Sequence, residues 1–190
     1  MRRLVRLLDS ILRRALGVFE FCDHPECVLR VRLAAAPRAL ALPACELPAG
    51  APVLELHLWN EHIAPMPDGG PDVAWAAEFA RRLRASFHAL AAQVRAEPRF
   101  APVEAVCGIT VLLGPDQGPA GERLFQRLGF TILPHRGRLG RFGEFWENLY
   151  SWWVMWTFNP ATLRGRRLLR LRRSELWMCR AEFLARYGGG

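Results

Sequence analysis

Two spacings of hydrophobic residues along the chain predict where its strands and helices lie. Alternation of apolar and polar residues over Val28–Leu33 and Val53–Trp59 predicts two half-buried strands. Ala39–Cys45 is predicted to be a weaker strand and Phe130–Leu133 a short one, while the apolar, β-branched run Val103–Leu113 is predicted to be a central strand. These segments predict a sheet.

Apolar residues at helical spacing predict helices between these strands and at both ends of the chain. Asp72 is the expected N-cap of a long helix that runs to Ala96, and Pro119–Leu128 is expected to form a second helix. The order β-β-β-α-β-α-β predicts the α+β class, with a single mixed sheet, packed helices and basic terminal helices. We expect Val53–Trp59 beside Val103–Leu113, with the long helix across both.

Residues 1–17 predict an amphipathic helix that ends at Gly17. Charged residues interrupt its leucines, so it lacks the continuous apolar core of a signal peptide. On a helical wheel one half is apolar and the other half is polar and basic, with Arg2, Arg3, Arg6, Arg13 and Arg14. Two interpretations stay open: the helix docks on its own domain with the arginines in water, or it lies on an anionic membrane.

A second candidate membrane element is the aromatic segment from Phe142 to Phe158. Four of the seven tryptophans fall within eleven residues of this segment, and arginines flank it on both sides. Tryptophan prefers the membrane–water interface, although an aromatic core helix ending at Asn159 is the alternative. Together with the basic ends, the segment favours peripheral membrane association, with three of its tryptophans as contacts: Trp152, Trp153 and Trp156.

Composition and charge fit this picture. The chain has 190 residues, 51% of them hydrophobic and 23% charged, which suits one ordinary domain with a sizeable core. All 26 basic residues are arginine, so the chain has neither a Schiff-base lysine nor a P-loop lysine. No apolar run approaches the length of a spanning helix.

Positive charge gathers at the two ends. Residues 1–17 carry a net +4 and residues 164–186 a net +6, whereas the rest of the chain is close to neutral. We therefore expect three parts: a basic amphipathic helix over 1–17, an α+β domain over 18–160 and a basic C-terminal helix over 161–190. The pattern indicates an anionic partner. Nucleic acid is not expected, because no nucleic-acid-binding motif is present.

The five cysteines are an odd number without the spacing of a disulfide framework, which favours a reducing, cytoplasmic compartment. Cys107 lies in an apolar run and is expected to be a small buried hydrophobe. Cys22, His24 and Cys27 lie close together but have no second cluster to complete four ligands, so no metal site is predicted.

The most polar spot in an apolar region is the end of the second clear strand. His57, Asn60 and His62 lie there, and two histidines beside Glu61 could serve general acid–base chemistry or act as metal ligands. Thr110 could line the same cleft if its strand is a neighbour. The alternative is an ordinary strand end, where an Asn caps a turn and a His lies at the surface.

The segment Leu124-Phe125-Gln126-Arg127-Leu128-Gly129-Phe130 resembles a motif near the end of GNAT-type acyltransferases. The resemblance implies an acyltransferase-like topology. Phe125 stands where many members of that family place a tyrosine acting as general acid, and phenylalanine has no proton to give. Asp68 and Asp72 lie where the phosphates of an acyl-CoA would need donors, so no tight binding of acetyl-CoA and no other cofactor is expected.

Over residues 20 to 160 the chain also resembles the YkoP-like bacterial domain. The resemblance is carried by Val28–Leu33, Leu56–Asn60, the long helix, Gly108–Thr110 and Leu128–Phe130. It implies a connection with the cell envelope and supplies no catalytic residues.

The expected function is that of a divergent acyltransferase-like peripheral protein on the cytoplasmic face of the inner membrane, acting on envelope lipid or glycan precursors. The alternative is a non-catalytic module that docks an envelope enzyme on lipid. A deep apolar pocket beside His57, Asn60 and Thr110 would favour the enzyme, and its absence the module.

Overall fold

A computed structural model describes residues 2–70, 72–111, 119–135, 140–163, 171 and 173–189. Its centre is one mixed five-stranded sheet in the order β1-β4-β5-β7-β6. β4 and β5 run parallel, and the other neighbours are antiparallel. The five strands are β1 (Leu29–Ala35), β4 (Pro52–Leu58), β5 (Ala105–Thr110), β6 (Thr131–Pro134) and β7 (Ser174–Cys179).

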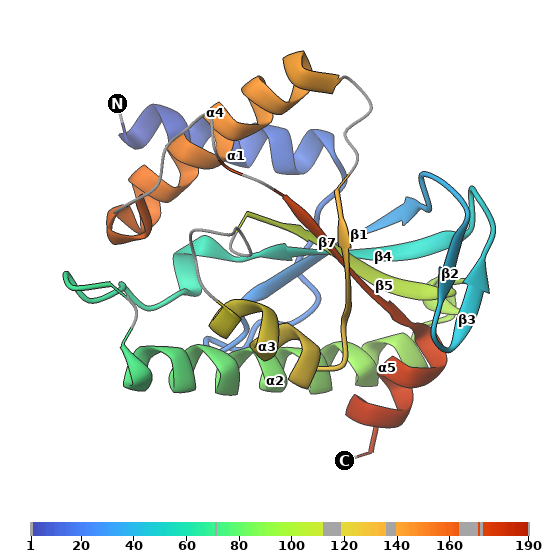
Figure 1. Ribbon diagram of the computed structural model, residues 1–190. Helices are drawn as coiled ribbons and strands as arrows, with labels where there is room; N and C mark the ends of the chain where they lie inside the picture. Colours follow the sequence, from blue (N-terminus) through green and yellow to red (C-terminus); the bar gives the residue numbers. More distant parts are fainter. Residues whose placement is uncertain are drawn as a thin grey trace.

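Helices cover both faces of the sheet (Figure 1). On one side lie α2 (Val73–Ala96), α3 (Pro119–Arg127) and α5 (Arg180–Tyr187), and on the other lie α1 (Arg2–Ala15) and α4 (Gly140–Phe158). α1 and α4 also pack on each other. Short 3-10 turns complete the described chain: η1 (Asn60–His62), η2 (Pro98–Phe100) and η4 (Pro160–Leu163).

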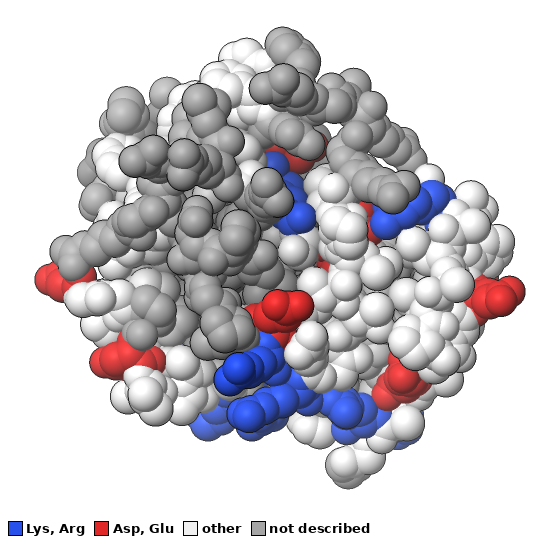
Figure 2. All heavy atoms as spheres, in the orientation of Figure 1, with Lys and Arg blue, Asp and Glu red and all other residues white. Residues whose placement is uncertain are grey.

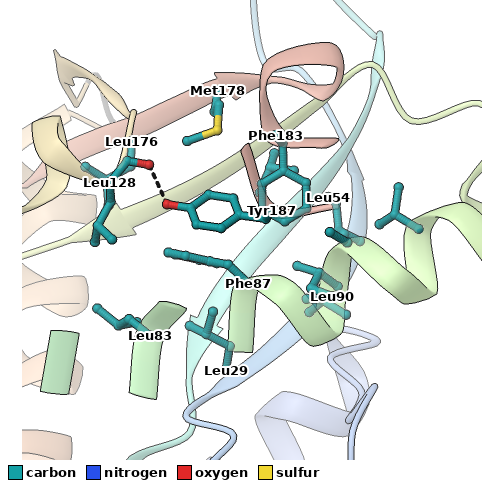
Figure 3. Close-up of a cluster of buried hydrophobic side chains, with 14 of the residues drawn as sticks. Leu29, Leu54, Leu83, Phe87, Leu90, Leu128, Leu176, Met178, Phe183 and Tyr187 are labelled. Carbon is teal, nitrogen blue, oxygen red and sulfur yellow. Dashed lines mark hydrogen bonds between the residues drawn. The ribbon is translucent and has the colours of Figure 1, made fainter. Parts of the chain in front are cut away.

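The main core lies between the sheet and the layer of α2 and α5 (Figure 3). Phe87 and Leu90 of α2 are buried against Leu54 of β4 and Phe183 of α5. The helix α2 begins where the sequence predicts, because the Asp72 side chain accepts a hydrogen bond from the Trp75 N–H at 2.7 Å.

Several predicted elements are confirmed. β4 and β5 are parallel neighbours joined by α2, with β5 in the middle of the sheet. The first helix and the long aromatic helix are present as α1 and α4. Gly17 follows α1 with a φ of +70°, as expected for a residue that ends a helix in the left-handed region. The central strand is shorter than Val103–Leu113, and positions 112 and 113 lie outside the described residues.

Two predicted elements are wrong. Ala39–Cys45 is not one strand but the hairpin of β2 (Leu40–Leu42) and β3 (Cys45–Leu47), which forms a separate two-stranded sheet. The C-terminal segment 161–190 is not one basic helix, because Ser174–Cys179 forms β7 between β5 and β6. The sheet thus extends beyond the expected domain boundary at residue 160.

The cysteines also depart from expectation. Cys45 of β3 and Cys179 of β7 form a disulfide that ties the hairpin to the main sheet, with 6.1 Å between the two Cα atoms. Disulfides persist in oxidising compartments. The odd cysteine count is therefore a poor guide to disulfides in this chain, and the expected reducing compartment stays a prediction.

Candidate functional site

The described large apolar side chains of α1 are exposed at the surface. The side chains of Leu7, Leu8, Ile11, Leu12 and Leu16 are each between 40% and 57% exposed. Ser10 and Arg13, from the polar half, are partly buried against the domain instead. This is the reverse of an amphipathic helix docked on its own core, since burial of apolar surface would favour the opposite orientation.

An ion-pair chain holds this polar half in place. Arg13 lies 3.8 Å from Glu61 of η1, and Glu61 also accepts a hydrogen bond from Arg30 of β1 at 3.2 Å. Arg30 is only 4% exposed, donates two further bonds to Glu20 and lies over the Trp59 ring. A buried guanidinium needs such partners, and α1 is anchored through them.

The second candidate membrane element, α4, is only partly in the core. Phe145, Trp146 and Trp153 are among the exposed large hydrophobic residues, whereas Trp152 and Trp156 are half-buried. The arginines at 136, 138, 164, 166 and 167 that flank this segment lie outside the described residues, and nothing is described of the side chains of Arg2, Arg3, Arg6 and Arg141.

Polar residues attach α4 to the sheet. Arg173, just before β7, donates to the Asn148 Oδ1 at 2.6 Å and to the Ser151 Oγ at 2.9 Å. Its guanidinium also lies 3.3 Å from Glu147. Asn148 is buried and donates to the Leu171 carbonyl. Because α4 is fixed by polar contacts, aromatic side chains on its other sides are left at the surface.

The sheet separates the predicted catalytic residues. Side chains alternate along a strand, so Leu56 and Leu58 of β4 pack toward α2 whereas His57 points to the opposite face. On β5, Val106 packs toward α2, and Thr110 therefore lies on the α2 face. His57 and Thr110 do not share a cleft.

The predicted residues of η1 have structural contacts. The His62 Nδ1 lies 2.8 Å from the Cys27 carbonyl, and the His62 ring stacks on Trp59 with ring centroids 3.7 Å apart. Asn60 begins η1 and is half-buried. These contacts give both residues a place in the fold, and a catalytic role for Asn60 and His62 stays a prediction.

The face of the sheet opposite α2 carries Arg30, Arg32, Glu55, His57 and Glu175, and we call it the polar face. A smaller hydrophobic cluster that includes Val53, Cys107 and Trp177 lies on the same face. Glu55 pairs with Arg32 across β1 and β4, and the His57 Nε2 lies 3.4 Å from Glu55. The layer of α1 and α4 stands over this face (Figure 1).

Glu175 is the most strongly held residue of the polar face, and sequence reasoning missed it. It is 4% exposed and accepts two hydrogen bonds from Arg38 at 3.1 and 2.8 Å and one from the Trp177 indole at 3.0 Å. The His135 Nδ1 lies 3.1 Å from the same carboxylate. If Ser174–Cys179 had been predicted as a buried strand, Glu175 would have been recognised as an acid inside it.

Cys107 is buried on this face, as expected of a small hydrophobe. Burial raises the pKa of its thiol far above the ordinary value, and the carboxylates of Glu55 and Glu175 raise it further. A thiol in such surroundings is inert, because the thiolate is the nucleophile. Cys107 is thus a packing residue.

Two further observations concern bound groups and membranes. Within the described ranges, no group of three or more His, Cys, Asp or Glu residues is arranged to hold a metal ion. Among the same residues, no helix is both long and apolar enough to cross a membrane.

The sheet with its two helical layers defines an α+β domain in which α1 and the β7–α5 segment are integral parts. The chain belongs to the YkoP domain family, whose family model matches residues 3–187. The match is longer than the resemblance over residues 20 to 160 and includes α1 and α5. Searches of curated proteins and of solved structures found no match.

Proposed function

We propose that this protein is a peripheral membrane-binding module of the bacterial envelope, and that α1 lies in the surface of an anionic membrane. The observation that carries the proposal is the orientation of α1: its apolar half is exposed while Arg13, from its polar half, pairs with Glu61 of the domain. An amphipathic helix exposed in this way has a ready partner in the headgroup–acyl boundary of a bilayer.

Insertion of the apolar side chains of α1 would supply enough free energy for reversible binding to a membrane. Burial of a whole Leu or Ile side chain is worth about 1.5–3 kcal/mol. Because the five apolar side chains of α1 are roughly half exposed, their insertion offers about 5 kcal/mol in total. Trp146 and Trp153 of α4, which packs on α1, would add to this at the interface.

Of the arginines predicted to contact the membrane, at least Arg13 is held by the domain instead. Arg14 is exposed on α1, but Arg13 is paired within the domain. Exposed arginines of α2, α3 and α5 gather instead at the lower edge of the view in Figure 2, on the other side of the sheet from α1. Attraction of lipid headgroups, at about 1 kcal/mol per arginine near the surface, therefore supplements apolar insertion.

The compartment is part of the proposal. The cytoplasmic side was expected from the cysteine pattern, and the Cys45–Cys179 disulfide removes that argument. We infer that the module lies on an oxidising side of the membrane, where such a bond persists. Alkylation of the protein in intact cells, before lysis, should leave Cys45 and Cys179 unmodified. Alkylation of both cysteines would show that they are reduced in the cell and would favour the cytoplasmic face.

Vesicle binding by surface variants tests the membrane surface residue by residue. The variant Leu7→Gln/Ile11→Gln/Leu16→Gln should lose most of its binding to anionic vesicles at every salt concentration, because the lost contribution is apolar. The variant Arg2→Gln/Arg3→Gln/Arg14→Gln should lose binding mainly at low salt, where screening is least.

The matched control is Val73→Gln, which replaces a highly exposed apolar residue at the start of α2. It should bind vesicles like the unmodified protein. Equal binding by the α1 triple variant and the control would overturn the proposal. A third outcome is that neither the control nor the α1 triple variant binds vesicles, while the unmodified chain is a dimer that the α1 triple variant dissociates. In that case a second copy of the chain covers α1, and not a membrane.

A second proposal is an acyltransferase-like enzyme that acts on envelope lipid or glycan precursors. It is supported by the Glu55–His57 pair on the polar face, beneath the layer that would touch the membrane. The Asp72 carboxylate occupies the N-terminus of α2, so acetyl-CoA should not bind tightly there. If calorimetry showed micromolar affinity for acetyl-CoA, an ordinary acetyltransferase would become the favoured function.

A further inference from the structure

Two free cysteines lie in the segment that leads into β1, one accessible and one buried. Cys22 is half-buried and lines a surface cavity of about 370 Å³, together with Glu20, Phe21, Asp23, Ala89 and Gln93. Cys27 is 3% exposed and belongs to the main core, and Cys22 packs against that core from outside. A reagent that enters the cavity therefore meets Cys22 first.

A tight turn lies between the two cysteines. The Cys27 N–H donates to the His24 carbonyl at 2.8 Å, and the His24 N–H donates to the Cys22 Sγ at 3.4 Å. The Cys22 side chain packs against the hydrophobic cluster that contains Cys27. The Cys27 thiol also donates to the Leu29 carbonyl at 3.4 Å, which fixes its sulfur at the base of the turn.

The two thiols differ in reactivity. Burial raises the pKa of Cys27, and the neighbouring Cys22 raises it further. The buried Cys27 thiol is thus less reactive toward a reagent in solution than an exposed thiol. Such a division between an accessible attacking thiol and a buried resolving thiol is what disulfide exchange requires.

We propose that Cys22 and Cys27 form a reversible dithiol–disulfide pair that exchanges with a small disulfide substrate. The Cys22 thiolate attacks one sulfur of R–S–S–R, and the first R–S⁻ leaves and takes up a proton as R–SH. Cys27 then loses its proton, attacks the Cys22 sulfur of the mixed disulfide and releases the second R–SH. The cysteine pair is oxidised by two electrons, and the substrate disulfide is reduced to two thiols.

The charge of the cavity indicates which disulfide fits. Glu20 and Asp23 line it beside Cys22. Because Glu20 is paired with Arg30, the exposed Asp23 carboxylate is the charge that disfavours an anionic disulfide and favours a cationic one. Cystamine, a small disulfide with two ammonium groups, is therefore the probe of choice.

Peptide mapping of the full protein measures the exchange directly. Cleavage after arginine releases residues 15–30, which contain both Cys22 and Cys27. After treatment with cystamine and blocking with iodoacetamide, we expect this peptide about 2 Da lighter than the dithiol and without alkylation, since two hydrogens are lost. Titration against cystamine and cysteamine should interconvert the two forms.

Three variants distinguish dithiol–disulfide exchange at Cys22 and Cys27 from ordinary modification of a single thiol. Cys27→Ser should stop at a cysteamine adduct on Cys22, and Cys22→Ser should leave Cys27 reduced. Cys107→Ser, a control at a buried free cysteine outside the pair, should exchange as the unmodified protein does. A stable cysteamine adduct on Cys22 of the unmodified chain, with Cys27 free, would overturn the proposal, and so would no reaction at either residue.

Discussion

Replacing Glu175 should destabilise the fold more than replacing an exposed acid. The variant Glu175→Leu removes the acceptor of two Arg38 hydrogen bonds and of the Trp177 indole. Breaking a fully buried ion pair costs about 3–5 kcal/mol. The Arg38 side chain is 30% exposed and can partly rehydrate, so we expect a loss of about 2–3 kcal/mol.

The reciprocal variant and the double variant make the interaction measurable. Arg38→Leu should also cost about 2–3 kcal/mol, because it leaves the Glu175 carboxylate buried with fewer donors. Arg38→Leu/Glu175→Leu should cost about 3 kcal/mol, less than the two single losses together, since neither charge is then left unpaired. The coupling free energy is thus expected to be on the order of 2 kcal/mol.

Urea denaturation followed by tryptophan fluorescence and by circular dichroism gives the four free energies of unfolding. Glu46→Leu, at an exposed position of β3, is the matched control and should change the stability by less than about 0.5 kcal/mol. A coupling below about 0.5 kcal/mol would refute the view that Glu175 and Arg38 hold the polar face together.

Two further predictions concern the other side of the sheet. Tyr187→Phe should cost about 1–2 kcal/mol, because the buried Tyr187 hydroxyl donates to the Leu128 carbonyl at 2.6 Å (Figure 3); an unchanged urea midpoint would contradict this. Hydrogen bonds from Arg81 and Arg82 lower the pKa of Glu78 to about 2, so its contribution to stability is full above 4.5 and is lost as the pH falls towards 2. NMR titration should show this pKa rising towards 4.5 in Arg81→Gln/Arg82→Gln.

The parts of the fold that sequence predicts well are those with a single clear period. Val53–Trp59 alternates cleanly, and Asp72 caps a helix whose apolar residues recur at helical spacing. α2 has one face in the core, and Leu54, Leu56 and Leu58 of β4 pack in the main core, although Val53 on the other face of β4 is buried as well. The parallel pairing of β4 and β5 follows from the helical connection between them.

The C-terminal strand could not be predicted in the same way. Ser174–Cys179 is buried on both faces, so apolar residues do not alternate with polar ones along it. It follows a run of arginines and leads directly into α5, which made a continuous basic helix the simpler interpretation. Its acid, Glu175, is stabilised by Arg38, a partner 137 residues away in sequence.

The candidate sites were predicted in part. The sequence identified both halves of the α1 wheel but left open which half faces the domain. That choice depends on Glu61 and Arg30, which meet Arg13 only in the folded chain. The grouping of His57 with Thr110 failed because a sheet has two faces, and strand register decides which residues share one.

Flotation of the protein with lipid vesicles tests directly whether it binds membranes. We expect the protein to rise with anionic vesicles at low salt, because exposed apolar residues of α1 can insert and its arginines attract anionic headgroups. It should rise in smaller amount with neutral vesicles, where only apolar insertion acts. If the protein stays at the bottom of the gradient with anionic vesicles at low salt, the membrane-binding account is contradicted.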